Sequence, residues 1–106
     1  MDKQLWLAHY AEGVPAEADV HAYASLRHLF GAAVARHRER PAFTCMGTTL
    51  RYGEIERLSR DFAGYLQKDL GMVRGDRLAI MLPNLLQYPV VLFGAFLAGL
   101  TVVNVN

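Results

Sequence analysis

The chain has 106 residues, of which 53% are hydrophobic and 20% are charged, and its formal net charge is +1. This length suits one domain with a core of its own, and the near-balance of charge excludes an electrostatic argument for nucleic acid or an acidic substrate as partner. The single cysteine, Cys45, excludes an intramolecular disulfide and fits a reducing compartment.

The first 24 residues are predicted to form an irregular N-terminal arm. Trp6, Leu7 and Tyr10 make an apolar cluster, and the acidic segment AEGVPAEADV follows. We expect the aromatic residues to dock the arm onto a larger body; contact with a membrane or another subunit is the alternative. Because the start of the arm contains Asp2 and Lys3 but no apolar core of a secretory signal, the expected location is cytoplasmic.

The spacing of apolar residues predicts an amphipathic helix that begins after Ser25, a suitable N-cap, and ends before Pro41. One stripe of this helix has the spacing of a buried face; it consists of Leu26, Leu29, Phe30, Ala33, Val34 and His37. Basic residues gather at the end of the helix, namely Arg36, His37, Arg38 and Arg40. We interpret them as complementing the helix dipole rather than as a nucleic-acid site.

The segment PAFTCMGTTLR, residues 41–51, consists of two short extended pieces hinged at Gly47 and Thr48. This pattern predicts a β-hairpin, although Gly-Thr is a weaker turn signal than Asn-Gly. Cys45 lies within the first piece, and we interpret it as a small packing residue rather than a reactive thiol.

A second amphipathic helix is predicted from Tyr52 to Leu70. Its apolar stripe consists of Ile55, Leu58, Phe62, Leu66 and Leu70. Two i,i+4 pairs of opposite charge mark its solvated side, and they are Glu56 with Arg60 and Arg57 with Asp61. Gly71 follows as the C-terminal cap, and residues 74–76 are predicted to make a tight turn into the next element.

The last thirty residues have the pattern of a βαβ unit. Two apolar runs too short for helices, Leu78–Leu82 and Thr101–Val105, flank a helix-length apolar segment, Tyr88–Ala98, which Gly99 ends. Such continuous apolar runs predict parallel strands buried on both faces, and therefore an α/β fold. Residues 25–106 would then form an incomplete α/β subdomain whose core needs further partners.

A membrane span is the alternative for this segment, because residues 78–105 contain no charged side chain. Pro83 and Pro89 interrupt any continuous helix, however. A helix from Pro89 to Gly99 would span only about 16 Å at about 1.5 Å per residue, against roughly 30 Å of hydrocarbon. The small residues of the segment are better explained by a helix that lies close on a sheet.

No catalytic, cofactor-binding or metal-binding residue is predicted. The two serines, Ser25 and Ser59, do not lie in a G-x-S-x-G elbow, and the four histidines lack metal-ligand spacing. The sequence contains neither G-x-G-x-x-G nor a phosphate-binding loop with its lysine. Asn84 and Asn104 sit at the C-terminal ends of the two predicted strands, at the edge where open α/β sheets bind ligands. Ending the strands and capping helices is the simpler explanation of these two residues.

Three segments in register resemble the opening of the adenylate-forming acyl-CoA synthetases, and they are TTLRYGEIERLSRDFAGYLQKDLGMVRGDRLAIMLPN, LLQYPVVLFGAFLAG and TVVNVN. A Y-G-E-L-like helix, a K-G-D-R-V-like turn and strand, a strand-ending P-N and a helix ending in A-G recur in this order in that superfamily. Within it, the segments WL, VPAE, PAF, LLQYPVVLFG and VVNVN resemble bacterial long-chain fatty-acid CoA ligases most. Arg51 departs from the Ser or Thr that often precedes the helix. Because arginine cannot accept capping hydrogen bonds, we expect the helix start to fray.

The resemblance implies that the chain is the N-terminal part of the large AMP-binding domain of such a ligase and is inactive alone. The complete enzyme would use ATP and Mg²⁺ to turn a long-chain fatty acid into an acyl-adenylate. Coenzyme A would then displace AMP and form the thioester, feeding fatty-acid degradation or lipid metabolism. The phosphate loop, acyl pocket and catalytic lysine would lie beyond Asn106. Peripheral contact with the inner membrane through Trp6 and Tyr10, and a homodimer, are further contacts that this assignment allows.

Two alternatives remain open. The chain could be a self-contained, non-catalytic α/β interaction module, or the enzyme could activate an aromatic or medium-chain acid. A module would bury residues 78–105 by itself or with a second copy, whereas a fragment would expose them and aggregate. Solubility and oligomeric state therefore distinguish the module from the fragment.

Overall fold

The computed structural model describes residues 4–106; the first three residues of the predicted arm, with Asp2 and Lys3, lie outside the described residues. The elements in chain order are η1 (Leu5–His9), α1 (Leu26–His37), β1 (Pro41–Cys45), β2 (Thr48–Arg51), α2 (Tyr52–Lys68), β3 (Arg77–Ile80), α3 (Gln87–Leu97) and β4 (Thr101–Asn104). Three α-helices combined with an antiparallel hairpin and a parallel strand pair confirm the predicted α/β class.

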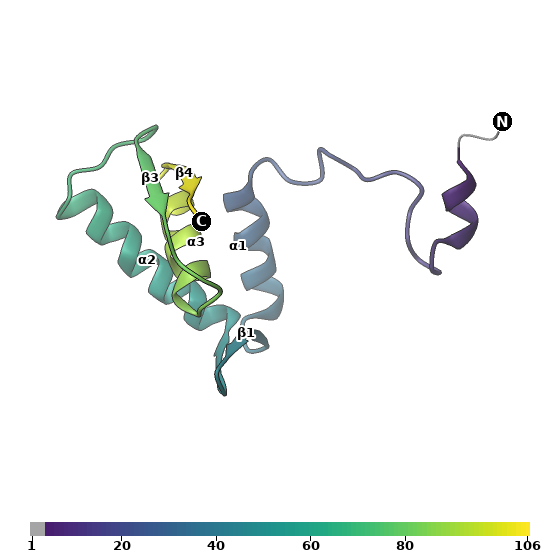
Figure 1. Cartoon of the computed structure of the whole chain (residues 1–106), viewed down its shortest axis with the longest axis horizontal. Helices are drawn as coiled ribbons and strands as arrows, with labels where there is room; N and C mark the ends of the chain where they lie inside the picture. Colours follow the sequence, from purple (N-terminus) through teal and green to yellow (C-terminus); the bar gives the residue numbers. More distant parts are fainter. Residues whose placement is uncertain (1–3) are drawn as a thin grey trace.

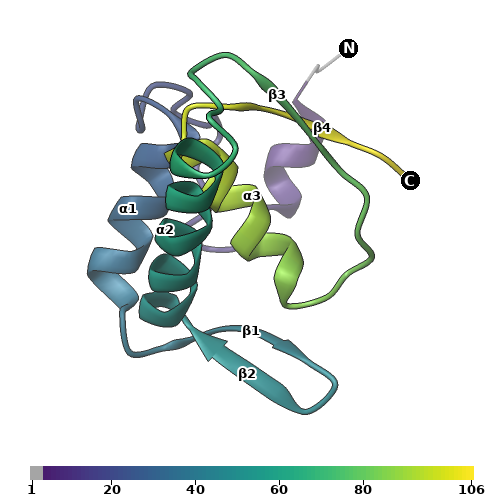
Figure 2. The same cartoon turned by 90° about the vertical axis from the view of Figure 1, so that its left-hand side faces the viewer.

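The helices pack together beneath the β3–β4 pair, and the β1–β2 hairpin projects from the opposite end of the helices (Figure 2). The arm runs away from this body (Figure 1), so that the chain extends 57 Å along its longest axis. Of the described arm residues, Leu7 is half-buried and the others are exposed. Docking of the arm onto a larger body therefore stays a prediction.

Helix α1 begins at the predicted cap, since the amide of His28 donates a hydrogen bond to Ser25 Oγ over 3.0 Å. Phe30 is buried and its ring stacks on Phe93 of α3, with ring centroids 4.1 Å apart. Leu26 and Leu29, the first members of the predicted stripe, are exposed instead. That part of the prediction is wrong because the first turn of α1 borders an open groove rather than a packed neighbour.

The hairpin forms as predicted, but its turn lies one residue earlier than expected. Cys45 pairs with Thr48, so the turn residues are Met46 and Gly47 rather than Gly47 and Thr48. Both turn residues have positive φ, 51° at Met46 and 81° at Gly47. A two-residue turn with this twist suits the twist of the strands. Methionine seldom adopts such a φ, which is why the sequence pattern placed the turn after Met46.

The start of α2 is held by the end of α1. The amide of Tyr52 donates to the carbonyl of Arg40 over 3.1 Å, and the amide of Gly53 donates to the carbonyl of Arg38 over 2.9 Å. The first amides of a helix have no partner within the helix itself. The carbonyls at the end of α1 supply these partners.

The fraying that Arg51 predicts for this helix start is therefore wrong. The amide of Arg51 donates to the Glu54 carboxylate over 2.8 Å, so one half of a capping box forms without any acceptor on the arginine side chain. The Arg51 guanidinium points elsewhere and lies 3.3 Å from Glu39 at the surface.

The buried stripe of α2 differs from the predicted one. Its buried members are Ile55, Ser59, Ala63 and Leu66. Leu70, the last residue of the predicted stripe, is 54% exposed, because the helix ends at Lys68 and Gly71 turns the chain with a φ of 64°. The predicted stripe therefore holds at Ile55 and Leu66 and is wrong at Leu70.

Other features of α2 follow the prediction. Glu56 lies 3.7 Å from Arg60, and Arg57 lies 3.9 Å from Asp61. After Gly71, the chain turns tightly at residues 73–76, where the amide of Asp76 donates to the carbonyl of Val73 over 3.0 Å.

Strands β3 and β4 are parallel, with Leu78 opposite Val102, and this confirms the βαβ unit. Gly99, with a φ of 77°, ends α3 as predicted. The amide of Leu100 donates to the carbonyl of Ala95 over 3.0 Å, which is the bond of a glycine-terminated helix end. Leu100 thereby enters the core, whose buried members are Ala63, Leu66, Ala95, Ala98 and Leu100.

The strands are not buried on both faces, so this part of the prediction is wrong. Leu78 and Val102 pack toward the helices, whereas Ala79 and Val103 on the other face are exposed. Helices cover only one face of the pair (Figure 2), and in the part of the chain that the structure describes β3 and β4 pair only with each other. Within the described residues, the pair therefore has an uncovered apolar face and two unpaired edges.

The membrane-span alternative is excluded for this segment. Helix α3 has only 11 residues and lies between two strands, so the apolar C-terminal segment is not one continuous helix. Throughout residues 4–106, the helices are too short or too polar to cross a membrane.

Candidate functional site

The carboxyl ends of β3 and β4 form the edge at which open α/β sheets bind ligands. Asn104 ends β4 there, and its side-chain oxygen accepts a hydrogen bond of 2.6 Å from the hydroxyl of Tyr88 on α3. Asn84 follows β3, and its carbonyl lies 3.7 Å from Cys45 Sγ of the hairpin. Asn84 does not cap α3, because the N-cap position is Leu86 and has no side-chain bond. The helix-capping explanation is therefore wrong for Asn84.

A small cavity of about 260 Å³ lies between the hairpin and the loop that leads into α3. Its lining consists of Phe43, Thr44, Cys45, Asn84, Leu85, Leu86, Tyr88 and Pro89. Cys45 is half-buried there and unpaired, as expected of a small packing residue. Without a charged group in its lining, this cavity suits an apolar group better than a phosphate.

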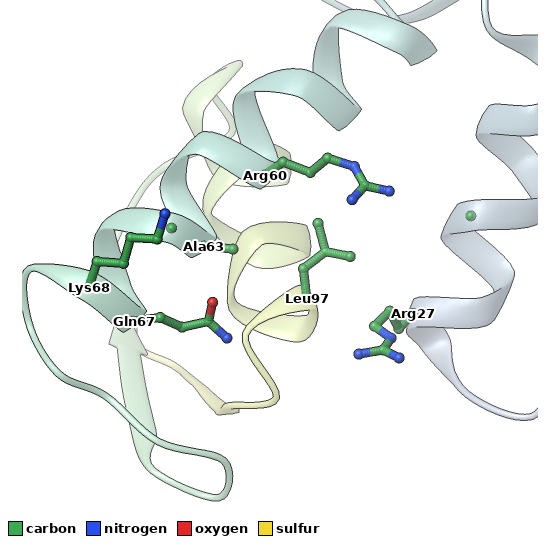
Figure 3. A pocket seen from close by; sticks show the side chains of 8 residues that line it. Arg27, Arg60, Ala63, Gln67, Lys68 and Leu97 are labelled. Carbon is green, nitrogen blue, oxygen red and sulfur yellow. The ribbon is translucent and has the colours of Figure 1, made fainter.

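A larger and more polar groove of about 590 Å³ lies between α1 and α2, with α3 below it. We call it the basic groove, and its lining includes Arg27, Arg60, Ala63, Gln67, Lys68 and Leu97. Figure 3 shows Arg27 and Arg60 reaching into it from opposite helices, on either side of Leu97. Its charged lining residues are all cations.

The described residues offer little for metal or nucleophilic chemistry. Within residues 4–106, histidine, cysteine and acidic side chains form no group of three that could hold a metal ion. Mg²⁺ prefers several oxygen ligands around one point, so the residues present do not fit this ion. The sequence-based assignment of no catalytic, cofactor or metal residue stays a prediction.

Sequence patterns could not identify the Tyr88–Asn104 bond or the basic groove. Tyr88 belongs to an apolar helix, where an aromatic residue is expected to pack rather than to donate a hydrogen bond. The cations of the groove come from helices that are distant in the sequence, so only their packing brings them together. Only the predicted βαβ topology could have indicated the Tyr88–Asn104 contact, because it places the start of α3 beside the end of β4.

Replacing Tyr88 by phenylalanine should loosen the end of β4. Loss of the 2.6 Å bond to Asn104 should cost about 1 kcal/mol, the usual net value of one hydrogen bond. The amide of Val105, which donates to the carbonyl of Ile80 over 2.9 Å, should then exchange with solvent about fivefold faster, as measured by hydrogen exchange.

Tyr65→Phe is the matched control for this variant. Tyr65 is 47% exposed, and its hydroxyl makes no hydrogen bond within the described part of the chain. Equal exchange rates of the Val105 amide in the two variants would show that the Tyr88–Asn104 bond does not fix β4.

Comparison with known proteins supports one family. The model of the family described as AMP-binding enzyme matches residues 30–106. The long-chain-fatty-acid–CoA ligases of Salmonella typhimurium and Escherichia coli O6:H1 are 51% and 50% identical to the chain over 104 residues, or 98% of its length. The same match covers 18% of each of these relatives, so the chain spans less than a fifth of their length.

Solved structures share the fold. The N-terminal subdomain of Klebsiella oxytoca NpsA, in complex with 3-hydroxyanthranilyl-AMSN, has a TM-score of 0.76 at 21% identity, and the match covers 85% of this chain and 23% of that one. At this identity the likeness concerns the fold alone. Because the family model covers most of the chain and the ligases match nearly all of it, the chain belongs to the AMP-binding enzyme family.

Proposed function

We propose that the chain is the opening part of the large domain of a long-chain fatty-acid CoA ligase. The observation that carries this proposal is the 51% identity to such a ligase over 98% of the chain. The uncovered face of the β3–β4 pair supports it as well. Val103 and Val105 are 42% and 41% exposed there, as expected where more strands and helices of a large domain pack.

The proposed reaction has two steps. An oxygen of the fatty-acid carboxylate attacks the α-phosphorus of ATP, so that pyrophosphate leaves and an acyl-adenylate forms. The sulfur of coenzyme A then attacks the acyl carbonyl, its proton is released, and AMP leaves. Activation is needed because a carboxylate oxygen is a poor leaving group, whereas AMP leaves with its charge spread over a phosphate.

The role proposed for this chain is structural support of that chemistry. The sheet edge of this chain fits neither Mg²⁺ nor the phosphates of ATP, because it presents amide and phenol groups rather than cations or grouped carboxylates. We therefore assign no residue of the chain to ATP, Mg²⁺ or coenzyme A. The 106 residues by themselves should be inactive.

Thioester formation by the full-length protein tests the proposal. With ATP, Mg²⁺ and coenzyme A, palmitate should give palmitoyl-CoA and AMP, whereas benzoate should give little product. Preference for benzoate would instead support an aromatic-acid ligase of the same family. The 106-residue chain alone is the control, and thioester formation by it would contradict the structural role.

A self-contained interaction module is the second candidate, and the long reach of the exposed arm is the observation that favours it. Sedimentation of the isolated chain distinguishes the two. A stable monomer or a discrete dimer would support a module, and aggregation through the exposed apolar face would support a part of a larger domain.

Peripheral membrane contact through the arm is part of the proposal. Trp6 and Tyr10 are 54% and 42% exposed, and such aromatic residues are favoured at membrane interfaces. Trp6→Ala in the full-length protein should lower co-sedimentation with liposomes several-fold. Equal binding by wild type and variant would remove the arm from the membrane contact.

A further inference from the structure

The basic groove between α1 and α2 has an unusual balance of charge for a hollow on a nearly neutral chain. Arg27, Arg60 and Lys68 line it, and the lining contains no acidic side chain. Arg60 reaches Glu56 only at 3.7 Å, and that carboxylate also lies 3.3 Å from Arg38. Among the described residues, the ion pairs involve neither Arg27 nor Lys68. Of the three cations that line the groove, only Arg60 has a carboxylate partner within residues 4–106, and it shares that carboxylate with Arg38.

Two glycines keep this space open. Gly31 of α1 and Gly64 of α2 both line the groove, in the interiors of their helices. Glycine weakens a helix relative to alanine, so a packing reason is expected where it occurs. Neither position supplies one, because a methyl group at either would meet no atom within 4 Å. Gly94 differs, since a methyl group there would collide with α2.

The cationic lining continues beyond the basic groove. A second hollow of about 550 Å³ shares Arg27, Gln67 and Leu97 with it and adds Arg74. Leu26, which lines this second hollow, is 59% exposed, and the neighbouring Leu29 is 40% exposed. Exposed leucines beside clustered cations are typical of surfaces that contact anionic membranes.

We propose that the basic groove binds the phosphate of an anionic phospholipid headgroup and so places the α1–α2 face on a membrane surface. The guanidinium groups of Arg27 and Arg60 offer charge-assisted hydrogen bonds to phosphate oxygens, and Lys68 adds a third charge. Leu26 contacts the apolar layer next to the headgroup. The inference deepens the peripheral membrane contact of the proposed function and rests on it.

An acidic peptide is the competing occupant. The arm of a second copy contains Glu12, Glu17 and Asp19 and could neutralise the same cations. The lipid is favoured because Leu26, which is 59% exposed, lies beside Arg27 and Arg74 in the lining of the second hollow, so that an apolar contact and cations are offered together. The experiment distinguishes these two occupants.

The test is binding of the full-length protein to phosphatidylcholine vesicles with and without phosphatidylglycerol. The triple variant Arg27→Gln, Arg60→Gln, Lys68→Gln should bind the anionic vesicles about 100-fold more weakly, since each cation near such a surface contributes roughly fivefold. The control variant Arg36→Gln, Arg40→Gln, Arg57→Gln removes the same charge outside the groove. It should lose less than about threefold, because distant charges are screened.

A second variant tests the shape of the groove without changing any charge. Gly64→Leu fills the space with a good helix former where the structure has room. It should weaken binding to the anionic vesicles by displacing the headgroup, while thermal unfolding shows that the variant is folded.

Three outcomes would overturn the inference. They are unchanged binding by the groove variants, an equal loss in the control variant, and a loss of self-association without a loss of lipid binding, which would assign the groove to the acidic arm. Thioester formation on palmitate without vesicles, as in the test of the proposed function, is the separate readout. Activity without lipid binding would contradict this inference alone, and lipid binding without activity would support it while contradicting the proposed ligase.

Discussion

Replacing Gly94 by valine should destabilise the chain by about 3 kcal/mol, because α3 lies so close to α2 at this residue that a side chain has no room. The first carbon of any side chain at position 94 would lie 2.8 Å from Phe62 Cδ1 and 2.9 Å from the carbonyl oxygen of Ser59. A ring can rotate away, but a backbone carbonyl within a helix cannot. Forcing bulk into such a contact typically costs about 1–3 kcal/mol or more.

Urea unfolding of the Gly94→Val variant measures this effect, and Gly64→Ala is the matched control. Gly64 lies in the helix that Gly94 contacts, but a methyl group there would meet nothing within 4 Å. The control should be as stable as the wild type or up to about 1 kcal/mol more stable, as expected from helix propensity. Similar destabilisation by both variants would show that helix flexibility, rather than the close crossing, explains the need for glycine.

This crossing explains where sequence analysis of α2 succeeded and where it failed. Large apolar residues at helical spacing identified the helix and its buried members Ile55 and Leu66. Two other buried members are Ser59 and Ala63, which are too small to stand out in a hydrophobic pattern. They are buried because they allow α3 to approach, and the approach depends on Gly94 in a different element. Within the described residues, the Ser59 hydroxyl has no hydrogen-bond partner, so the close contact is kept despite a polar cost.

For the strands, the sequence predicted the elements and their pairing but not what covers them. Apolar runs predicted β3, β4 and their parallel pairing, and all three are confirmed. The prediction that both faces are buried was wrong. An apolar pattern shows that a strand can be buried on both faces, but in this chain helices pack on only one of them. Local patterns specify an element and its faces, but the partners on each face are a tertiary property.

The candidate site was predictable only in its location. Topology placed Asn84 and Asn104 at the carboxyl ends of the strands, and in the structure Asn104 is the last residue of β4 while Asn84 follows β3. Which side chain Asn104 would bind depends on the register between α3 and β4, which no sequence pattern contained. The basic groove was even harder to predict from the sequence, because it depends on how α1 and α2 lie against α3 and on the absence of side chains at two glycines.

Replacing Leu66 by alanine should cost about 2–5 kcal/mol, the range found when a buried leucine is removed and a cavity remains. Leu66 is 1% exposed and lies in the core cluster formed with Ala63, Ala95, Ala98 and Leu100. The buried members of this cluster include three alanines, whose short side chains cannot move to fill the space, although larger side chains such as Phe62 and Met72 pack at its border. A loss in this range is a large part of the roughly 5–15 kcal/mol that holds a domain of this size folded.

Leu70→Ala is the control that separates the structure from the sequence pattern. Both leucines belong to the predicted stripe of α2, but Leu70 is 54% exposed and lies beyond the end of the helix. Its replacement should therefore change the free energy of unfolding by less than about 0.5 kcal/mol in the 106-residue chain. A large loss at Leu70 would contradict the early end of α2, and a small loss at Leu66 would contradict the core in which α2 and α3 meet β3 and β4.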